Sequence, residues 1–216
     1  MRRVALLLGI HRTTVERKLT FLAKVGWMEH RRFIESLRSD RSVSLQFDEM
    51  ETSEHTKLKP LSIALAVDTQ RRKFLGFEVS QMPASGLLAK KALKKYGFRR
   101  DERARGLDSL LRFIQPAVSP QALIESDQKP LYPPLVKKHF PDSPHVSHPG
   151  RRGCVVGQGE LKRGGYDPLF VLNHTCAMIR ANVNRLFRRT WCTTKKRERL
   201  VEHLILYVNF HNQVLT

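Results

Sequence analysis

The sequence predicts an α/β fold in which a mixed sheet is flanked by helices, with a small all-helical segment in front. Apolar residues recur with helical spacing up to about residue 40 and alternate with polar residues from there on. Three alternating runs come next, followed by helical runs separated by short apolar strands. The 216 residues, 41% of them hydrophobic, suffice for one packed domain and a small appendage. We therefore expect a helical segment and linker over residues 1–40 and an α/β domain over residues 41–216.

The chain carries 39 Lys and Arg residues against 20 Asp and Glu residues, which gives a net charge of +19. This excess is spread along the chain and does not form one block. Each phosphate that Lys or Arg neutralises releases condensed counterions, so such a balance favours a polyanionic partner. A solubilising surface is the alternative, but nucleic acid is the expected partner.

The cysteines are few and far apart: Cys154, Cys176 and Cys192. They suggest neither a disulfide framework nor a Cys-x-x-Cys zinc site, which fits a reducing cytoplasm. No apolar run approaches the roughly 20 residues that span a bilayer, and the apolar run after Arg2-Arg3 is too short for a signal peptide. We expect a cytoplasmic protein with no membrane partner.

A helix-turn-helix is predicted at the N-terminus. Ala5, Gly9 and Val15 have the spacing of two helices that cross closely, with glycine making the turn. The second helix should begin near residue 12 and bury three aliphatic side chains: Val15, Leu19 and Leu22. Its first polar side chains could face a major groove or phosphates: Arg12, Thr13, Thr14 and Arg17. The chain starts inside the first helix, so we expect a truncated segment, joined to the next domain by a helical or linking stretch over residues 25–40.

Strands are predicted over residues 43–50, 61–69 and 73–80, the last two joined by a hairpin over 69–72. In the first strand Val43, Leu45 and Phe47 alternate with Ser44, Gln46 and Asp48. One face can therefore enter a core while the other presents the Asp48 carboxylate.

Helices over residues 86–96 and 107–114 should follow, and then a short strand over 122–124 that leads into Asp127. Ligands gather at the carboxyl ends of strands in open sheets, which is where Asp127 lies. A loop-rich stretch with a short strand near 145–147 precedes two final helices, over 169–190 and 198–214. This element order is that of a ribonuclease H-like domain. Two neighbouring carboxylates such as Asp48 and Asp127 can hold Mg²⁺ ions about 3.5–4 Å apart for phosphodiester chemistry, although both could instead be surface residues.

Several motifs resemble bacterial insertion-sequence transposases of the DDE superfamily: Phe47-Asp48-Glu49, Ser126-Asp127, Asn209-Phe210-His211-Asn212, and above all Arg180-x-x-x-x-Arg185-Leu186-x-Arg188-Arg189-Thr190-Trp191-Cys192-x-Thr194-Lys195. The resemblance implies a helix-turn-helix ahead of a ribonuclease H-like catalytic domain; the zinc ribbon that often precedes them is missing. It also implies two Mg²⁺ or Mn²⁺ ions, oligomers on DNA, cleavage at transposon ends and strand transfer into target DNA. The localisation implied is the bacterial nucleoid.

The third metal ligand departs from the family pattern. Relatives carry glutamate seven residues before the first arginine of the last motif, and this chain has Asn173 there. An asparagine carbonyl can still bind Mg²⁺. The rival is Glu160, which follows Asp127 by 33 residues, and Asn173 could also simply cap its helix. The same resemblance implies that basic residues beyond Asn173 grip DNA phosphates: Arg180, Arg185, Arg188, Arg189 and Lys195.

Two other functions remain open at this stage. A decayed or truncated transposase would bind element ends without cutting them, which the start of the chain and the asparagine at position 173 would favour. A nuclease of the same fold acting on RNA–DNA hybrids would not be expected to carry a helix-turn-helix.

Overall fold

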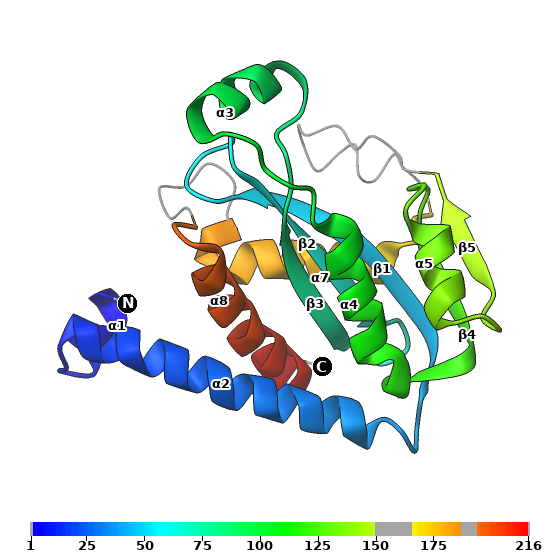
Figure 1. Cartoon of the computed structure of the whole chain (residues 1–216). Helices are drawn as coiled ribbons and strands as arrows, with labels where there is room; N and C mark the ends of the chain where they lie inside the picture. The colour runs from blue at the N-terminus through cyan, green and yellow to red at the C-terminus, as the bar shows by residue number, and fades with distance from the viewer. Residues whose placement is uncertain (1, 150–165, 187–193, 216) are drawn as a thin grey trace.

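The computed structural model describes residues 2–149, 166–186 and 194–215. Its centre is a five-stranded mixed sheet with the strand order β3-β2-β1-β4-β5 (Figure 1). The strands are β1 (Ser42–Ser53), β2 (Pro60–Asp68), β3 (Phe74–Gln81), β4 (Val118–Asp127) and β5 (His145–His148). The first three strands pair antiparallel, and β1 with β4 and β4 with β5 pair parallel. Consequently β1, β3, β4 and β5 run in the same direction, and their carboxyl ends point to the same end of the sheet.

Helices cover both faces of this sheet. The helices among the described residues are α1 (Arg2–Leu7), α2 (Arg12–Ser36), α3 (Ala89–Tyr96), α4 (Arg103–Ile114), α5 (Tyr132–His139), α7 (Phe170–Asn182) and α8 (Arg197–Phe210). Short 3-10 turns lie at Gly86–Leu88, Gln115–Ala117 and Asn184–Leu186, and a π-helical turn at His211–Leu215. The α/β fold with a mixed sheet flanked by helices is thus confirmed, and it is compatible with a ribonuclease H-like arrangement.

Alternate residues of β2 divide the core into two apolar clusters. Ile63 and Leu65 belong to the cluster that includes α7 and α8, whereas Ala64 and Ala66 belong to the cluster that includes α4 and α5. Successive strand residues point to opposite faces, so the two clusters lie on the two sides of the sheet. In the last helix Leu200, Leu204, Tyr207 and Val208 recur at helical spacing, and all four are buried in the first cluster.

The N-terminal region is two helices joined by a turn, in which Gly9 has a φ of +60° that favours glycine. Leu19 is buried as expected, but Leu22 is 47% exposed and Val15 is only half-buried. The stretch over 25–40 was expected to be helical or linking; residues 25–36 continue the same helix, α2, and residues 37–40 form the turn before β1. That helix packs along α8 (Figure 1), and it contributes Ala23 to one apolar cluster and Ile34 to the other.

The asparagines of the Asn-Phe-His-Asn motif tie the end of the chain to distant elements. The Asn212 side chain accepts a hydrogen bond from the Phe74 N–H at 2.9 Å and donates one to the Phe74 carbonyl at 2.9 Å. The Asn209 Nδ2 donates to the Gly26 carbonyl at 2.7 Å. A Cβ atom at Gly26 would lie 2.9 Å from that nitrogen, so α2 and α8 approach closely because residue 26 has no side chain. These two asparagines therefore stabilise the fold directly.

His30 joins α2 to the sheet from a fully buried position. Its Nε2–H donates to the Leu75 carbonyl at 3.0 Å, and its ring stacks on Phe113 with the centroids 5.7 Å apart. Burial lowers the pKa of His30 to about 4, although the hydrogen bond to Leu75 opposes this effect. The neutral imidazole is thus the form that the folded protein accepts.

Replacing Asn212 by alanine should lower the free energy of unfolding by about 2–4 kcal/mol, because two buried backbone groups of Phe74 lose their partners. Urea unfolding followed by circular dichroism measures the change. The matched control is the exposed neighbour Gln213, whose replacement by alanine should change stability by less than about 0.5 kcal/mol. Equal effects of the two substitutions would contradict the structural role of Asn212.

A second prediction concerns pH. An unfolded histidine has a pKa of about 6.5, so between there and the folded value of about 4 the unfolded chain takes up a proton that the folded protein refuses. Stability should therefore fall as the pH is lowered through this window. His30→Phe should remove about 2–3 kcal/mol of the stability difference between about pH 7 and about pH 4.5.

The control for this prediction is Asn209→Ala, which removes the hydrogen bond to the Gly26 carbonyl without removing a titrating group. Urea unfolding at the two pH values should show the full wild-type difference for Asn209→Ala and a smaller one for His30→Phe. An undiminished pH dependence in His30→Phe would rule out the buried neutral imidazole as its cause.

Candidate active site

The two aspartates singled out in the sequence lie together on neighbouring parallel strands, toward the carboxyl ends of those strands. Asp48 is in the second half of β1, and Asp127 is the last residue of β4. The parallel pairing of Gln46 with Glu125 brings the two positions to a similar level. The Lys129 Nζ lies 2.7 Å from the Asp48 Oδ1 and 3.5 Å from the Asp127 Oδ2. The two oxygens are therefore no farther apart than the sum of these distances.

Three further side chains meet at this point: Glu49, Lys129 and Tyr132. Glu49 entered the sequence analysis only as part of the Phe47-Asp48-Glu49 motif, and the other two were not singled out there. The Tyr132 hydroxyl donates to the Asp48 Oδ1 at 2.9 Å and accepts a hydrogen bond from the Lys129 ammonium at 2.9 Å. The Glu49 Oε2 lies 3.7 Å from the same ammonium. Three carboxylates thus surround one lysine, with a tyrosine holding both Asp48 and the lysine in place.

The charges of this cluster act on one another. Burial raises the pKa of Asp127, the negative charge of Asp48 raises it further, and Lys129 opposes both. Burial alone would lower the pKa of Lys129, but the three carboxylates outweigh it and raise the pKa. Burial and the same carboxylates hold the pKa of Tyr132 far above its ordinary value, so its hydroxyl remains a donor. The surroundings of Asp127 therefore disfavour its charged form.

A buried amide holds α7 against the strand that carries Asp48. The Gln46 Nε2 donates to the Pro168 carbonyl at 2.8 Å and to the Glu125 Oε2 at 3.0 Å. Its Oε1 accepts a hydrogen bond from the Leu172 N–H at 3.1 Å. Because Gln46 and Asp48 are two residues apart on one strand, they share a face. The start of α7 is therefore fixed on the face from which the Asp48 side chain projects.

Cys176 shows that α7 continues past the aspartates. Burial raises the pKa of its thiol to about 12, Arg180 lowers it, and the negative charge of Asp48 raises it. The thiol therefore lies within electrostatic range of both Asp48 and Arg180. An inert, protonated thiol is the form that this position supports.

Asn173, the expected third ligand, lies on the exposed side of the first turn of α7. Its Nδ2 donates to the Asp167 Oδ2 at 2.9 Å, and its own N–H donates to the Leu169 carbonyl. Within the ranges that the structure covers, no hydrogen bond joins Asn173 to Asp48 or Asp127. The rival ligand, Glu160, lies outside the described residues. The structure thus brings two of the four candidate ligands together.

The expected DNA-contacting residues fall into separate groups. At the start of α2, Thr13, Thr14 and Arg17 are exposed, whereas Arg12 pairs with Glu16 at 2.9 Å. The predicted helix over 169–190 ends earlier, since α7 stops at Asn182 and Arg185 lies in the following 3-10 turn. Arg180 and Arg185 therefore do not form a stripe on one helix. Lys195 is exposed, and Arg188 and Arg189 lie outside the described residues.

A divalent metal ion needs several side-chain oxygen or nitrogen atoms that converge on one point. Among residues 2–149, 166–186 and 194–215, no group of three or more His, Cys, Asp or Glu side chains is arranged to hold one. The Asp127 Oδ1, however, is buried without a hydrogen-bond partner beside the Asp48 carboxylate. Two hard oxygen donors and one unused acceptor suit Mg²⁺. The Lys129 ammonium supplies the positive charge between them in this structure.

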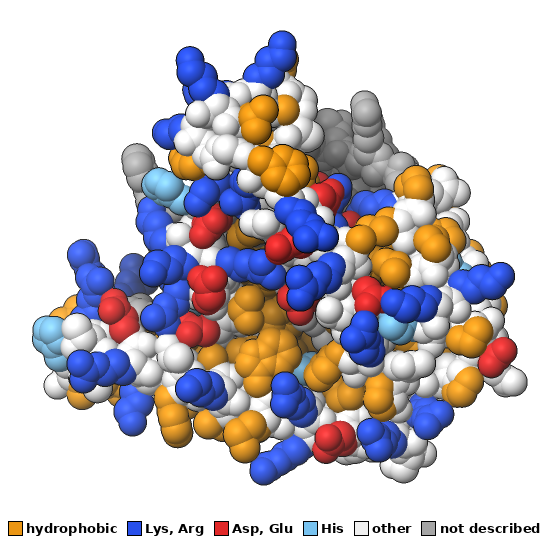
Figure 2. Space-filling view, in the orientation of Figure 1, with side chains coloured by type: hydrophobic (Ala, Val, Ile, Leu, Met, Phe, Trp, Pro, Cys, Tyr) orange, Lys and Arg blue, Asp and Glu red, His pale blue; other side chains and the backbone are white. Residues whose placement is uncertain are grey.

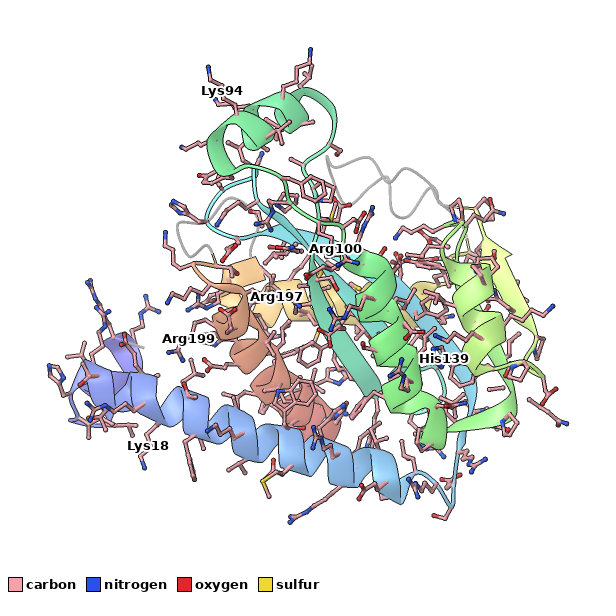
Figure 3. All side chains as sticks on the ribbon, viewed as in Figure 1. Lys18, Lys94, Arg100, His139, Arg197 and Arg199 are labelled. Carbon is pink, nitrogen blue, oxygen red and sulfur yellow. The ribbon has the colours of Figure 1, made fainter. Side chains whose placement is uncertain are left out.

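A separate hollow of about 260 Å³ lies between β3, α4 and α8. Arg197, labelled in Figure 3, reaches into it and pairs with Glu102 at 2.9 Å and with Glu78 at 3.8 Å. The hollow lies against the edge strand β3, two strands away from β1. Its charges are already neutralised by one another, so we place the site at the aspartates instead.

The chain matches no protein-family model, no curated protein and no solved structure. None of the helices that the structure describes combines the length and apolar character needed to cross a membrane.

The Lys129 ammonium holds together carboxylates that repel one another without it. Lys129→Met should therefore lower the free energy of unfolding at neutral pH by about 1–3 kcal/mol, the cost of hydrogen bonds lost to charged groups. Millimolar Mg²⁺ should restore much of this loss by binding the freed carboxylates. Urea unfolding with and without Mg²⁺ tests this, with the exposed Lys137→Met as the matched control. A Lys129→Met protein as stable as the control, or indifferent to Mg²⁺, would contradict it.

Proposed function

We propose that this protein is a DDE-type DNA transposase that cleaves at insertion-sequence ends and transfers the freed strand into target DNA. The observation that carries the proposal is the meeting of Asp48, within β1, and Asp127, the last residue of the parallel strand β4. The strand order β3-β2-β1-β4-β5, the charge of +19 and the motif resemblance are consistent with it. A basic surface favours DNA, and a pair of hard carboxylates favours metal-assisted phosphodiester chemistry.

Mg²⁺ or Mn²⁺, two ions in the family pattern, would neutralise charge that develops on the phosphate during cleavage. On the protein side, Asp48 and Asp127 would hold the metal, and Tyr132 keeps Asp48 oriented through its 2.9 Å hydrogen bond. The Lys129 side chain is about one-third exposed, so it can move toward solvent or toward a DNA phosphate when a metal takes its place. Asn173 or Glu160 would complete the ligand set.

The second candidate is a transposase copy that binds element ends without cutting them. Two observations favour it: Lys129 already neutralises the aspartates, and Asn173 is engaged with Asp167. Such a protein would bind DNA through the same basic surface but would gain nothing from Mg²⁺. Oligomer formation on DNA is part of both proposals.

Asp48→Asn and Asp127→Asn should each reduce Mg²⁺-dependent cleavage of a labelled element end at least about 1,000-fold, because an amide does not replace a charged metal ligand. The amide keeps the size of the side chain, so affinity for the uncut duplex should change less than about 3-fold. Gel analysis of the cleaved strand and fluorescence anisotropy measure the two quantities. Asp142→Asn, an exposed carboxylate after α5, is the matched control and should cleave like wild type.

The outcomes separate the candidates. Cleavage that survives in Asp48→Asn would exclude the proposed site. Wild-type protein that binds the duplex but cuts nothing with Mg²⁺ or Mn²⁺ would favour the non-cutting copy. Asn173→Ala and Glu160→Ala, tested in the same assay, identify the third ligand as the one whose loss abolishes cleavage.

A further inference from the structure

The segment that connects β3 to α4 is basic and projects away from the sheet. It consists of residues 82–100, includes α3, and stands away from the rest of the protein (Figure 1). We call these residues the lysine arm. Residues 79–100 contain no Asp or Glu, and the arm carries six basic residues: Lys90, Lys91, Lys94, Lys95, Arg99 and Arg100. The function proposed above did not use any of them.

The base of the lysine arm is anchored to the hairpin between β1 and β2. The Arg99 guanidinium donates to the Met82 carbonyl at 3.5 Å and to the Pro60 carbonyl at 3.4 Å, and lies 4.0 Å from Glu54. The Lys59 ammonium stands over the Tyr96 ring, 5.3 Å from its centroid. These contacts fix the direction in which the arm projects.

The lysines of α3 face away from the body of the protein. With about 100° per residue, Lys90, Lys91, Lys94 and Lys95 fall on one side of the helix, while the buried Ala92 and half-buried Tyr96 fall on the other. All four lysines are exposed, and in the part of the chain that the structure describes none of them pairs with a carboxylate. Figure 2 shows blue side chains projecting from this end, and Figure 3 shows Lys94 at its tip.

The arm also lies toward the same end of the sheet as the aspartates. It follows directly after β3, whose carboxyl end points to the same end of the sheet as those of β1 and β4. Asp127 is the last residue of β4 and lies toward that end. A duplex held by the lysine arm would therefore run past the end of the sheet that carries the candidate active site.

We propose that the lysine arm grips the phosphate backbone of the DNA on which the aspartate site acts, an inference that rests on the proposed function. Four ammonium groups on one helix face, none of them paired with a carboxylate among the described residues, are suited to a polyanion, because each phosphate contact releases a counterion. A second copy of this chain would bring its own charge of +19 toward the lysines and be repelled. The arm is thus a DNA contact additional to the start of α2 and the basic residues beyond Asn173.

The test compares two variants that lose the same charge. K90Q/K91Q/K94Q/K95Q removes the lysines of the arm, and K24Q/R31Q/R32Q/R38Q removes four exposed cations on or just after α2. Fluorescence anisotropy with a labelled duplex at several salt concentrations gives the affinity and its salt dependence. The arm variant should bind at least about 10-fold more weakly at 0.1 M salt. Its slope of log affinity against log salt should be shallower by about 2–4, since each phosphate contact contributes about 0.9. The control variant should stay within about 3-fold of wild type.

A third variant with arginine at the four arm positions should retain affinity, and circular dichroism should show all variants folded. Equal losses in the arm and control variants would overturn the arm proposal, while Asp48-dependent cleavage by wild type would leave the proposed function standing. Wild-type protein that binds no duplex would remove both. If the arm variant keeps its DNA affinity but loses self-association in light scattering, the arm contacts a second copy and the proposal is wrong.

Discussion

The arrangement around the aspartates depends on the buried side chain of Gln46. One amide satisfies the Pro168 carbonyl, the Leu172 N–H and one oxygen of Glu125, and His148 holds the other Glu125 oxygen at 2.9 Å. This chain of hydrogen bonds links β1, β4, β5 and the start of α7 on one face of the sheet. Buried polar groups are costly unless every one is satisfied, so these elements have one acceptable relative position. The placement of Asp48 beside α7 follows from that position.

Charge at the aspartates is balanced by the protein itself. Lys129 approaches Asp48, Glu49 and Asp127, and Tyr132 donates to Asp48. A metal ion and an ammonium group would compete for the same carboxylates, so any metal affinity here is reduced by the need to displace the lysine. The basic residues elsewhere do not face this competition. The DNA binding and the metal binding that we propose would accordingly be separable from one another.

The sequence was informative where periodicity is local. The strands predicted over 43–50, 61–69 and 73–80 correspond to β1, β2 and β3. Alternation marks β1, whereas β2 and most of β3 are buried on both faces and are marked by their short apolar runs. For residues 25–40 the sequence left a helix and a linker both open, and residues up to Ser36 are helical because Ala23, His30 and Ile34 are buried at helical spacing against elements far away in sequence.

The proximity of Asp48 to Asp127 could be anticipated from their places on two strands whose carboxyl ends point to the same end of the sheet. Lys129 and Tyr132 could not, because their contacts depend on how the start of α5 folds back over β1. Helix α7 was expected to reach residue 190, and nothing in the apolar pattern marks its end at Asn182.

The amide of Asn212 has a consequence for assembly. β3 is an edge strand, and an unpaired edge is a template on which another chain can add a strand. By occupying the N–H and carbonyl of Phe74, Asn212 imitates a neighbouring strand at the point where β3 begins. Another chain cannot pair there without displacing the end of this one. The Asn212 side chain thus protects the sheet from extension by a foreign strand at that point.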